Sequence, residues 1–346
     1  MHIMLRLFSF LLCVSIVFPV LAQTDLGALS YDKMLSGYAY PFKIHRRSFT
    51  SQGQSLEMAY MYLRDGDESP HTSANQKTGN RPVVLLLHGK NFNGAYWADT
   101  ARMLVAEGYD VLIPDQIGFG KSSKPKNYQY SFASLAQNTQ GLIDSLDIKK
   151  VIVVGHSMGG MLASRFALMY PDITHQVVLV NPIGLENYLQ YVQYKDIAFF
   201  YSNEKEASSD KIISYQKKNY YDGQWNAAYQ ALTYPLIGWI QGPDADLMAS
   251  VSARCYDMIF TQPVIEEFKN FKVPVTLILG TRDRTGPGRN WMRDGVTYEL
   301  GRYDLLGDRV KKRNRAITLV KIKGVGHLPH IEDFPRFKKA FLKALR

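Results

Sequence analysis

The residues around Ser157 have the types and spacing of an activated nucleophile. They form a Gly-x-Ser-x-Gly pattern, Gly155-His156-Ser157-Met158-Gly159, after an apolar run and before a helix-compatible segment. Small residues on both sides of the serine allow a sharp strand-to-helix turn, in which the strand and the helix approach closely and the serine backbone is strained. Such a turn lifts the hydroxyl out of the sheet and points the following N–H groups at a developing negative charge. The pattern therefore predicts Ser157 as a nucleophile.

A serine hydroxyl is a poor nucleophile unless a base removes its proton and another group orients that base. Few histidines of this chain could serve as the base. His327 stands behind the glycine-rich loop 324–326, which lets an imidazole reach over a sheet edge, so we predict His327 as the base. His330 is the alternative. Because it follows Pro329 at the approach to a helix, we expect it beside the site or exposed.

The elements that must position these residues alternate along the chain. Short apolar runs, typical of strands buried on both faces, recur at 83–87, 111–113, 151–154, 177–180, 275–279 and 316–322. Helix-length segments lie between most of them, at 97–107, 131–146 and 158–169. This alternation predicts an α/β fold with a mostly parallel central sheet and helices on both faces.

The chain ahead of the first buried run has a different pattern. Residues 42–49 and 56–63 look like two strands joined by a turn at 51–54. They should form an antiparallel N-terminal edge of the sheet. Residues 65–81 are polar and rich in Ser, Asn and Gly, which predicts a surface loop.

One connection is far longer than a crossover between neighbouring strands needs. Residues 184–271 are helix-like and rich in aromatic side chains. We predict that they form a helical cap over the C-terminal edge of the sheet, so that residues 23–183 and 272–346 make up the core. The aromatic side chains could line a ligand pocket or fill the interior of the cap, and both interpretations stay open.

Five motifs follow one another along the chain, each at the end of a predicted strand. They are His88-Gly89-Lys90-Asn91-Phe92, the segment from Asp115 to Ser122, the segment from Gly155 to Gly160, the segment from Leu279 to Asp283, and Gly324-Val325-Gly326-His327. In these motifs and their order the chain resembles the α/β-hydrolase superfamily, in particular its lidded, esterase-like serine hydrolases. The resemblance covers nearly all of residues 40–346 and implies an α/β-hydrolase fold.

The resemblance also assigns roles to particular residues. Ser157 matches the nucleophile, His327 the base and Asp283 the acid that orients the base. Asp304 and Asp308 are the alternatives to Asp283, because an insertion over residues 286–315 lengthens the interval between the acid and the base.

Two backbone N–H groups should hold the negative oxygen that forms in the transition state. Met158, directly after the nucleophile, matches one donor, and Lys90 matches the other; only the backbone of Lys90 has a role in this interpretation. His88 and His156 lie in motifs where the family uses histidine for structure. The serine at 157 argues against dehalogenases and epoxide hydrolases, which carry a carboxylate there.

These residues predict hydrolysis of a carboxylic ester through an acyl-serine intermediate. Amide or peptide hydrolysis, carbon–carbon bond hydrolysis and acyl transfer use the same triad and stay open, as does a non-catalytic binding protein on this scaffold, which is less favoured. The cap favours a small-molecule substrate with an apolar or aromatic acyl group, with Tyr229 and Trp239 as candidate pocket residues. Because the triad residues lie outside 184–271, we expect the cap to set selectivity and to contribute little to the chemical step.

The N-terminus has the pattern of a secretory signal peptide over residues 1–22. Arg6 precedes an apolar run, and Ala22 supplies a small residue before the expected cleavage site. The run is shorter than the roughly 20 residues that span a bilayer. We therefore expect a secreted or periplasmic protein with no stable membrane anchor after cleavage. Cys255 alone would then remain, so no intramolecular disulfide could form.

No cofactor, metal or nucleic acid is expected. The formal net charge is +10, but the excess is spread along the chain, and its densest run, 311–315, is better explained as a solvated helix face or loop. Residues 120–122 end like a phosphate-binding loop, yet Asp115 stands where that pattern needs its first glycine. The glycines near Ser157 form no dinucleotide-binding pattern, and the histidines lack the spacing of a zinc site.

Overall fold

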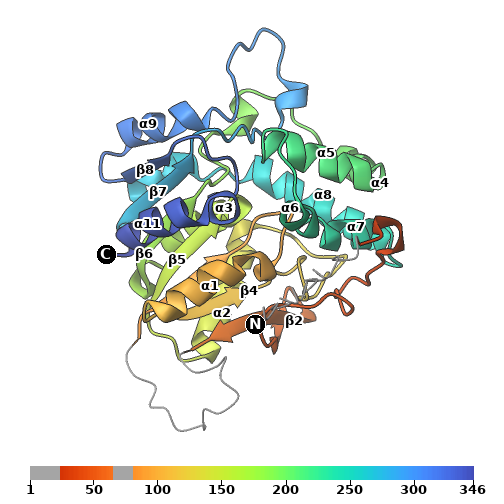
Figure 1. The fold of residues 1–346 in the computed structure, drawn as a ribbon, viewed down its shortest axis with the longest axis horizontal. Helices are drawn as coiled ribbons and strands as arrows, with labels where there is room; N and C mark the ends of the chain where they lie inside the picture. Colours follow the sequence, from red (N-terminus) through yellow and green to blue (C-terminus); the bar gives the residue numbers. More distant parts are fainter. Residues whose placement is uncertain (1–23, 65–80) are drawn as a thin grey trace, which may run out of the picture.

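The computed structural model of the protein describes residues 24–64 and 81–346. The predicted signal peptide, 1–22, and all but the last residue of the predicted loop, 65–81, lie outside the described residues. The described chain forms an eight-stranded sheet with helices on both faces and a further group of helices beside it (Figure 1).

The sheet confirms the alternation of elements expected from the sequence. Its strands are β1 (His45–Ser51), β2 (Gln54–Leu63), β3 (Val83–Leu87), β4 (Asp110–Pro114), β5 (Val151–His156), β6 (Thr174–Val180), β7 (Val275–Gly280) and β8 (Thr318–Ile322). Their order across the sheet is β1-β2-β4-β3-β5-β6-β7-β8. β1 pairs with β2, and β2 with β4, in antiparallel fashion, whereas the other neighbours are parallel. The predicted antiparallel N-terminal edge is therefore confirmed.

The N-terminal hairpin is tighter than predicted. β1 begins later than expected, at His45, and the turn consists of Gln52 and Gly53 with φ values of 49° and 71°. A two-residue turn with positive φ at both positions matches the right-handed twist of the paired strands. Ser51 and Gln54 therefore pair directly.

Helices cover both faces of the sheet (Figure 1). α2 (Phe132–Ser145), α3 (Met158–Met169) and α9 (Tyr303–Arg313) pack on one face, and α1 (Ala98–Ala106) and α11 (Phe334–Leu345) pack on the other. Alternate residues of a central strand therefore enter different apolar cores: Leu85 packs on the side of α2 and α3, and Leu86 on the side of α1 and α11. A strand covered on both faces needs an uninterrupted apolar run, which β3 has.

The long connection between β6 and β7 folds as helices. They are α4 (Ile197–Lys205), α5 (Ser209–Asn219), α6 (Ala227–Ala231), α7 (Tyr234–Ile240) and α8 (Ala245–Thr261), flanked by 3-10 turns at Tyr188–Gln190 and Ile265–Asn270. We call residues 184–271 the cap. Within it α4 packs along α8, and the cap helices, green to cyan in Figure 1, lie together beside the core.

The remaining helices are short, and one of them lies in the insertion 286–315. The short helices are Leu26–Ala28, Gly94–Trp97, Pro171–Ile173, Arg289–Trp291 and α10 (Pro329–Glu332). The insertion supplies α9, and the basic run 311–315 forms its exposed last turn and the residues after it, where cations interact favourably with the helix dipole. No helix in residues 24–64 or 81–346 is long and apolar enough to cross a membrane.

Candidate active site

Ser157 stands on a sharp turn between β5 and α3. Its φ of 56° and ψ of −122° are strained values for a residue with a side chain. A Cβ on Gly155 would lie 2.1 Å from the carbonyl oxygen of Gly159, and a Cβ on Gly159 would lie 2.3 Å from the carbonyl oxygen of Leu87. The strand and the helix thus pass too close for larger residues, which explains the glycine spacing around the serine.

The structure brings Ser157, His327 and Asp283 together. The Nε2 atom of His327 lies 3.0 Å from Oγ of Ser157, and its Nδ1 atom lies 2.7 Å from Oδ2 of Asp283. His327 and Asp283 are fully buried, and Ser157 is 7% exposed. A neutral imidazole that donates from Nδ1 to the carboxylate presents the lone pair of Nε2 to the serine hydroxyl. The arrangement can therefore accept the serine proton.

Three groups hold the carboxylate of Asp283. Besides His327, the side-chain amide of Asn181 donates to it at 2.8 Å and the backbone N–H of Thr285 at 2.7 Å. Burial by itself would raise the pKa of this carboxyl, but the imidazole and the two donors outweigh burial and hold the pKa of Asp283 below its ordinary value. Asp283 therefore stays ionised and can stabilise a protonated His327.

Asn181 is a site residue that the sequence interpretation missed. It follows β6; its Nδ2 donates to Asp283, and its Oδ1 accepts from the backbone N–H of Gly280 at 2.9 Å. One signal was available, namely a polar residue directly after a buried strand. Because the carboxyl ends of parallel strands meet at one edge of the sheet, such a residue is a candidate neighbour of the predicted acid.

The two alternative acids lie away from His327. Asp304 lies 2.8 Å from the guanidinium of Arg302, and Asp308 lies 2.6 Å from the ammonium of Lys321. Both carboxylates belong to α9 and are occupied by ion pairs there. The structure therefore places Asp283, and neither alternative, against the imidazole.

The alternative base, His330, lies beside the site and is buried. It is 1% exposed and stacks on Trp97 with ring centroids 4.4 Å apart. Burial, and next the ring of His327, lowers the pKa of His330 to about 3. His330 therefore remains a neutral packing residue. Of the two expected places for it, beside the site or exposed, the structure shows the first, because α10 turns the ring inward against Trp97.

His88 and His156 use their ring nitrogens for structure. Nδ1 of His156 lies 2.9 Å from the hydroxyl of Tyr96, and Nε2 lies 2.8 Å from the carbonyl oxygen of His327. His88 accepts from the backbone N–H of Gln116 at 3.1 Å. Burial lowers the pKa of both imidazoles, so both stay neutral. His156 thereby fastens the loop that carries His327.

The predicted oxyanion donors flank Ser157. Met158 is the first residue of α3, so its N–H has no acceptor within the helix. On the other side, a Cβ on Gly89 would lie 3.1 Å from Cβ of Ser157, so the backbone that leads into Lys90 passes close to the nucleophile. We call residues 88–93 the oxyanion loop. The roles of Lys90 and Met158 stay predictions.

A residue of the cap also contacts the candidate base. Tyr220, at the end of α5, stacks on His327 with ring centroids 4.6 Å apart, and its carbonyl oxygen accepts from the N–H of His327 at 3.4 Å. A Cβ on Gly326 would lie 2.1 Å from that carbonyl oxygen, so this approach requires a glycine before the histidine. The sequence interpretation did not single out Tyr220, since nothing local distinguishes it from the other tyrosines of the cap.

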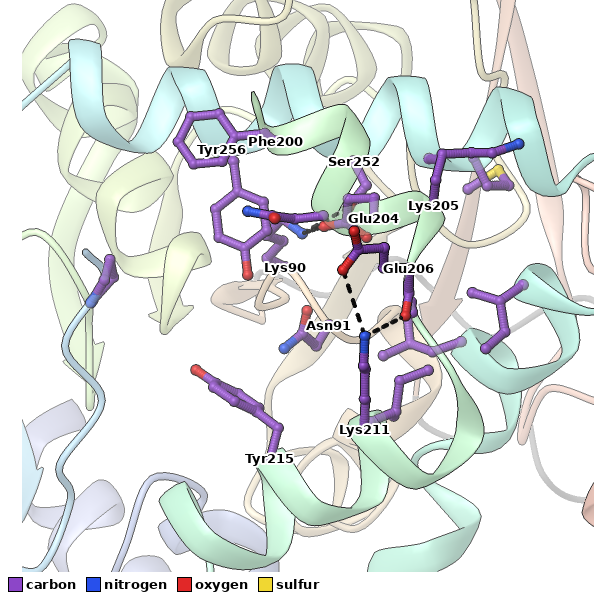
Figure 2. A pocket seen from close by; sticks show the side chains of 18 of the residues that line it. Lys90, Asn91, Phe200, Glu204, Lys205, Glu206, Lys211, Tyr215, Ser252 and Tyr256 are labelled. Atoms are coloured by element: carbon purple, nitrogen blue, oxygen red, sulfur yellow. Dashed lines mark hydrogen bonds and ion pairs between the residues drawn. The ribbon is translucent and has the colours of Figure 1, made fainter. Parts of the chain in front are cut away.

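A pocket of about 760 Å³ lies between the cap and the core. Figure 2 shows Lys90 of the oxyanion loop beside Tyr256 of α8, and Asn91 between Lys90 and Tyr215 of α5. The pocket therefore adjoins the loop that passes over Ser157.

Only one of the two aromatic residues predicted for the pocket lines it. Trp239 forms part of the wall. Tyr229 instead stacks on Tyr221, with ring centroids 3.8 Å apart, inside the cap. The prediction for Tyr229 is therefore wrong, because Tyr221 covers the ring of Tyr229 and leaves it buried inside the cap.

No metal site accompanies these groups in the part of the chain that the structure describes, where no cluster of three or more His, Cys, Asp or Glu side chains could hold an ion. Cys255 is buried and unpaired. Burial raises the pKa of its thiol to about 12, so it stays protonated and unreactive.

Comparison with known proteins agrees with this geometry. Residues 82–334 match the family described as alpha/beta hydrolase fold. The crystal structure of a probable hydrolytic enzyme from Pseudomonas aeruginosa is 38% identical, with a TM-score of 0.86, and the match covers 92% of this chain and 99% of that one. This similarity extends through the core and the cap alike.

A curated relative and a further solved structure differ in the activities that their names give. A 2-hydroxy-6-oxo-6-phenylhexa-2,4-dienoate hydrolase from Burkholderia cepacia is 38% identical over 31% of this chain and 38% of that protein. A thermophilic esterase from Thermogutta terrifontis is 18% identical with a TM-score of 0.63, over 87% of this chain and 98% of that one, which shows a shared fold alone. The matches to curated relatives span between 31% and 47% of those proteins' length. Because the family match covers most of the chain and the Pseudomonas structure matches it nearly end to end, this protein belongs to the alpha/beta hydrolase fold family.

Proposed function

We propose that this protein is a serine hydrolase that cleaves carboxylic esters through an acyl-serine intermediate. One observation carries the proposal: in a buried site, His327 lies 3.0 Å from the hydroxyl of Ser157 and 2.7 Å from the carboxylate of Asp283. A base within hydrogen-bond reach of the nucleophile, with its tautomer fixed by an ionised acid, is what acyl transfer to serine requires.

Acylation would begin when Oγ of Ser157 attacks the ester carbonyl carbon and its proton passes to Nε2 of His327. The N–H groups of Met158 and Lys90 would hold the oxyanion of the tetrahedral intermediate. A preorganised donor of this kind lowers the barrier by about 3 kcal/mol. As the carbon–oxygen bond breaks, His327 gives its proton to the leaving alcohol oxygen, and Asp283 stays ionised throughout.

Deacylation would repeat these steps with water as the nucleophile. His327 takes a proton from water, the hydroxide oxygen adds to the acyl carbon, and the same two N–H groups hold the second oxyanion. When the bond to Oγ breaks, His327 returns the proton to Ser157 and the carboxylic acid leaves. The serine and the imidazole are thereby restored.

An apolar or aromatic acyl group is the substrate feature that the pocket supports. Its wall includes Phe119, Phe200 and Trp239, beside charged side chains such as Lys211 and Arg289. Removing apolar surface from water stabilises a complex by roughly 25 cal/mol per Å². Such a wall favours acyl groups that bury carbon against these rings.

A second candidate is hydrolysis of a carbon–carbon bond next to a ketone. It rests on the local similarity to the dienoate hydrolase of Burkholderia cepacia. The two reactions share the attack on a carbonyl carbon and differ in the leaving group, which is an alcohol oxygen in one case and a carbon atom in the other. The acid that protonates the leaving group must therefore serve a different atom.

Labelling and a substrate panel test both candidates. A fluorophosphonate should label Ser157, as located by mass spectrometry, and absence of a label would contradict the nucleophile and favour a binding protein. The panel contains esters of graded acyl length, the matching amides and 2-hydroxy-6-oxo-6-phenylhexa-2,4-dienoate. We expect the highest kcat/KM on an ester, and a higher value on the dienoate would reassign the protein to carbon–carbon hydrolysis.

Export from the cytoplasm belongs to the same proposal. It is supported by the signal-peptide pattern of residues 1–22. N-terminal sequencing of the protein recovered outside the cytoplasm should return a chain that begins near Gln23. A chain that retained Met1 would contradict cleavage.

A further inference from the structure

The side chain of Lys90 leaves the oxyanion loop and enters the cap. Its ammonium lies 3.2 Å from Oε1 of Glu204 on α4, donates to Oγ of Ser252 on α8 at 2.7 Å, and lies 3.7 Å from the centroid of the Tyr256 ring. Figure 2 shows Lys90 enclosed by these side chains. The side chain of Lys90 thus joins the core to the cap, and the backbone N–H of the same residue is predicted to hold the oxyanion.

These contacts use the full bonding capacity of the ammonium. An ammonium has three N–H donors, and a carboxylate, a hydroxyl and an aromatic face lie around this one. The side chain of Lys90 is only 11% exposed, so water does little to solvate it. A charge that is largely removed from water loses favourable interactions when it leaves its partners. The end of this side chain is therefore a fixed point on the cap.

The next residue of the loop is fastened to another part of the cap. The side-chain amide of Asn91 donates to the hydroxyl of Tyr220 at 3.0 Å. Tyr220 in turn stacks on His327 and accepts from its backbone N–H. Two consecutive residues of the oxyanion loop are thus tied to the two sides of the pocket, Lys90 to α4 and α8, and Asn91 to the end of α5.

We propose that Lys90 is a positioning residue: its ammonium, anchored to Glu204 and Ser252 of the cap, sets the place of its own backbone N–H over Ser157. The proposal rests on the proposed function, since it concerns the oxyanion of acyl transfer. It assigns a role to the Lys90 side chain, beyond the backbone role that the sequence suggested. It also makes the cap a contributor to the chemical step.

The physical reason is the sensitivity of an oxyanion donor to its position. The donor must lie about 2.7–3.1 Å from the place that the oxyanion will occupy. The oxyanion loop is short and contains no helix or strand. The nearest helix is a 3-10 turn that begins at Gly94, directly after the loop. A displacement of about 1 Å at a positioning group can lower the rate by about a hundredfold.

Three single variants and one double variant test this role in the full chain. Lys90→Met keeps the backbone N–H and an unbranched side chain as far as Cε, and removes the ammonium. We expect kcat for a reactive aryl ester to fall by at least about tenfold, with KM within about threefold, because donor alignment affects the transition state more than substrate binding. Glu204→Gln should lower kcat by about threefold, since an amide oxygen still accepts from Lys90 but carries no charge.

Asp246→Asn is the matched control. Asp246 pairs with Lys205, so this ion pair joins α4 to α8 as Glu204 and Ser252 do, but it does not reach the oxyanion loop. We expect kcat within about twofold of the wild type. In the double variant Lys90→Met/Glu204→Gln, the loss should equal that of Lys90→Met alone, because the partners act as a unit.

A tetrahedral-adduct inhibitor supplies a readout that a merely structural role would not move. Ser157 adds reversibly to the carbonyl carbon of an aryl trifluoromethyl ketone, the serine proton passes to His327, and the resulting oxyanion occupies the oxyanion hole. The inhibition constant should rise in Lys90→Met by about the same factor by which kcat falls. Melting temperatures of all variants show that each is folded.

Several outcomes would overturn the proposal. They are a folded Lys90→Met variant with wild-type kcat and inhibitor affinity, an equal loss in Asp246→Asn, or a double variant whose loss is the product of the single losses. Failure of the proposed function looks different: wild-type protein would then resist fluorophosphonate labelling at Ser157 or turn over no ester. If Lys90→Met does not fold, Glu204→Gln with its inhibitor affinity and the Asp246→Asn control decide the question alone.

Discussion

Two regions around the site differ in how they are packed. One is the set of loops at the carboxyl ends of β5, β7 and β8, and the other is the cap that faces these loops. In the loops, the backbone makes close approaches that only glycine permits, and the triad side chains are at most 7% exposed. Between the helices of the cap, side chains carry the packing, through ring stacks such as Phe200 on Tyr256 and ion pairs such as Lys205 with Asp246, whose side chains are 49% and 64% exposed.

This difference indicates what each region can tolerate. A loop fixed by its backbone keeps reacting atoms in one place, so the loss of one reacting group there lowers the rate by orders of magnitude. A region packed through side chains can change its composition and reshape the pocket while the triad stays in place. The exceptions are Lys90 and Tyr220, where the two regions meet.

Among changes in the loops, Ser157→Ala should cause the largest loss of kcat/KM. The change removes the attacking oxygen, so kcat/KM should fall by about 10⁵-fold or more. It removes one hydroxyl and leaves the strained backbone as it is, so the melting temperature should change little. Kinetics on an aryl ester and thermal unfolding check both parts. Retention of more than about a thousandth of wild-type activity would refute the nucleophile.

Asp283→Asn should be the second largest loss, about 10³–10⁴-fold in kcat/KM. The amide cannot stabilise a protonated His327, and its NH₂ group facing Nδ1 would favour the wrong tautomer of the imidazole. Asp308→Asn is the control, because Asp308 pairs with Lys321 away from the triad. It should keep kcat/KM within about twofold. Similar losses in both variants would mean that Asp283 is not the orienting acid.

Trp239→Ala and Tyr229→Ala test the cap side. Trp239 lines the pocket, so its removal should change the ratio of kcat/KM between a long and a short ester by about tenfold, through lost burial of the acyl group. Tyr229 packs on Tyr221 away from the pocket wall, so its removal should lower the melting temperature and leave that ratio unchanged. An unchanged ratio in Trp239→Ala would exclude Trp239 from acyl selectivity, and an unchanged ratio across a set of such cap variants would exclude the cap.

The pH dependence of stability gives the smallest effect, and it reports on the packing beneath the triad. The pKa of His330 is about 3 in the folded protein against an ordinary value of 6.5. Between these pH values the unfolded chain binds a proton that the folded protein does not. His330 therefore lowers the free energy of unfolding as the pH falls below about 6.5, by at most about 1.4 kcal/mol per pH unit.

His330→Phe should make this dependence less steep, because phenylalanine can keep the stack on Trp97 without taking a proton, while the buried His88 and His156 keep their contributions. Urea unfolding between pH 7 and pH 5 measures the slope. His175→Gln makes a similar change on an exposed imidazole and should leave the slope close to that of the wild type. A wild-type slope in His330→Phe would show that other groups set the acid sensitivity.

The elements of the core could be predicted well because their signals are local. β3 and α3 have the bounds expected from the sequence, since a buried strand needs a continuous apolar run and the elbow dictates where the helix begins. The hairpin bounds were less accurate, because they depend on the backbone angles that Gln52 and Gly53 adopt. Asn181 was missed, since its role requires knowing that β6 lies beside β7.

The sequence by itself indicated the family and the elbow with Ser157, because these motifs depend on local residue order, and it limited the base to His327 or His330 and the acid to Asp283, Asp304 or Asp308. The choice of His327 and Asp283 came with the tertiary structure, which brings them to Ser157. Only the tertiary structure decided the burial of His330, the exclusion of Tyr229 from the pocket and the partners of the Lys90 side chain. Lys90 and Glu204 are 114 positions apart, and they meet because the cap folds over the oxyanion loop. Such contacts depend on how two separately packed regions face each other, and no local pattern of residue types encodes that arrangement.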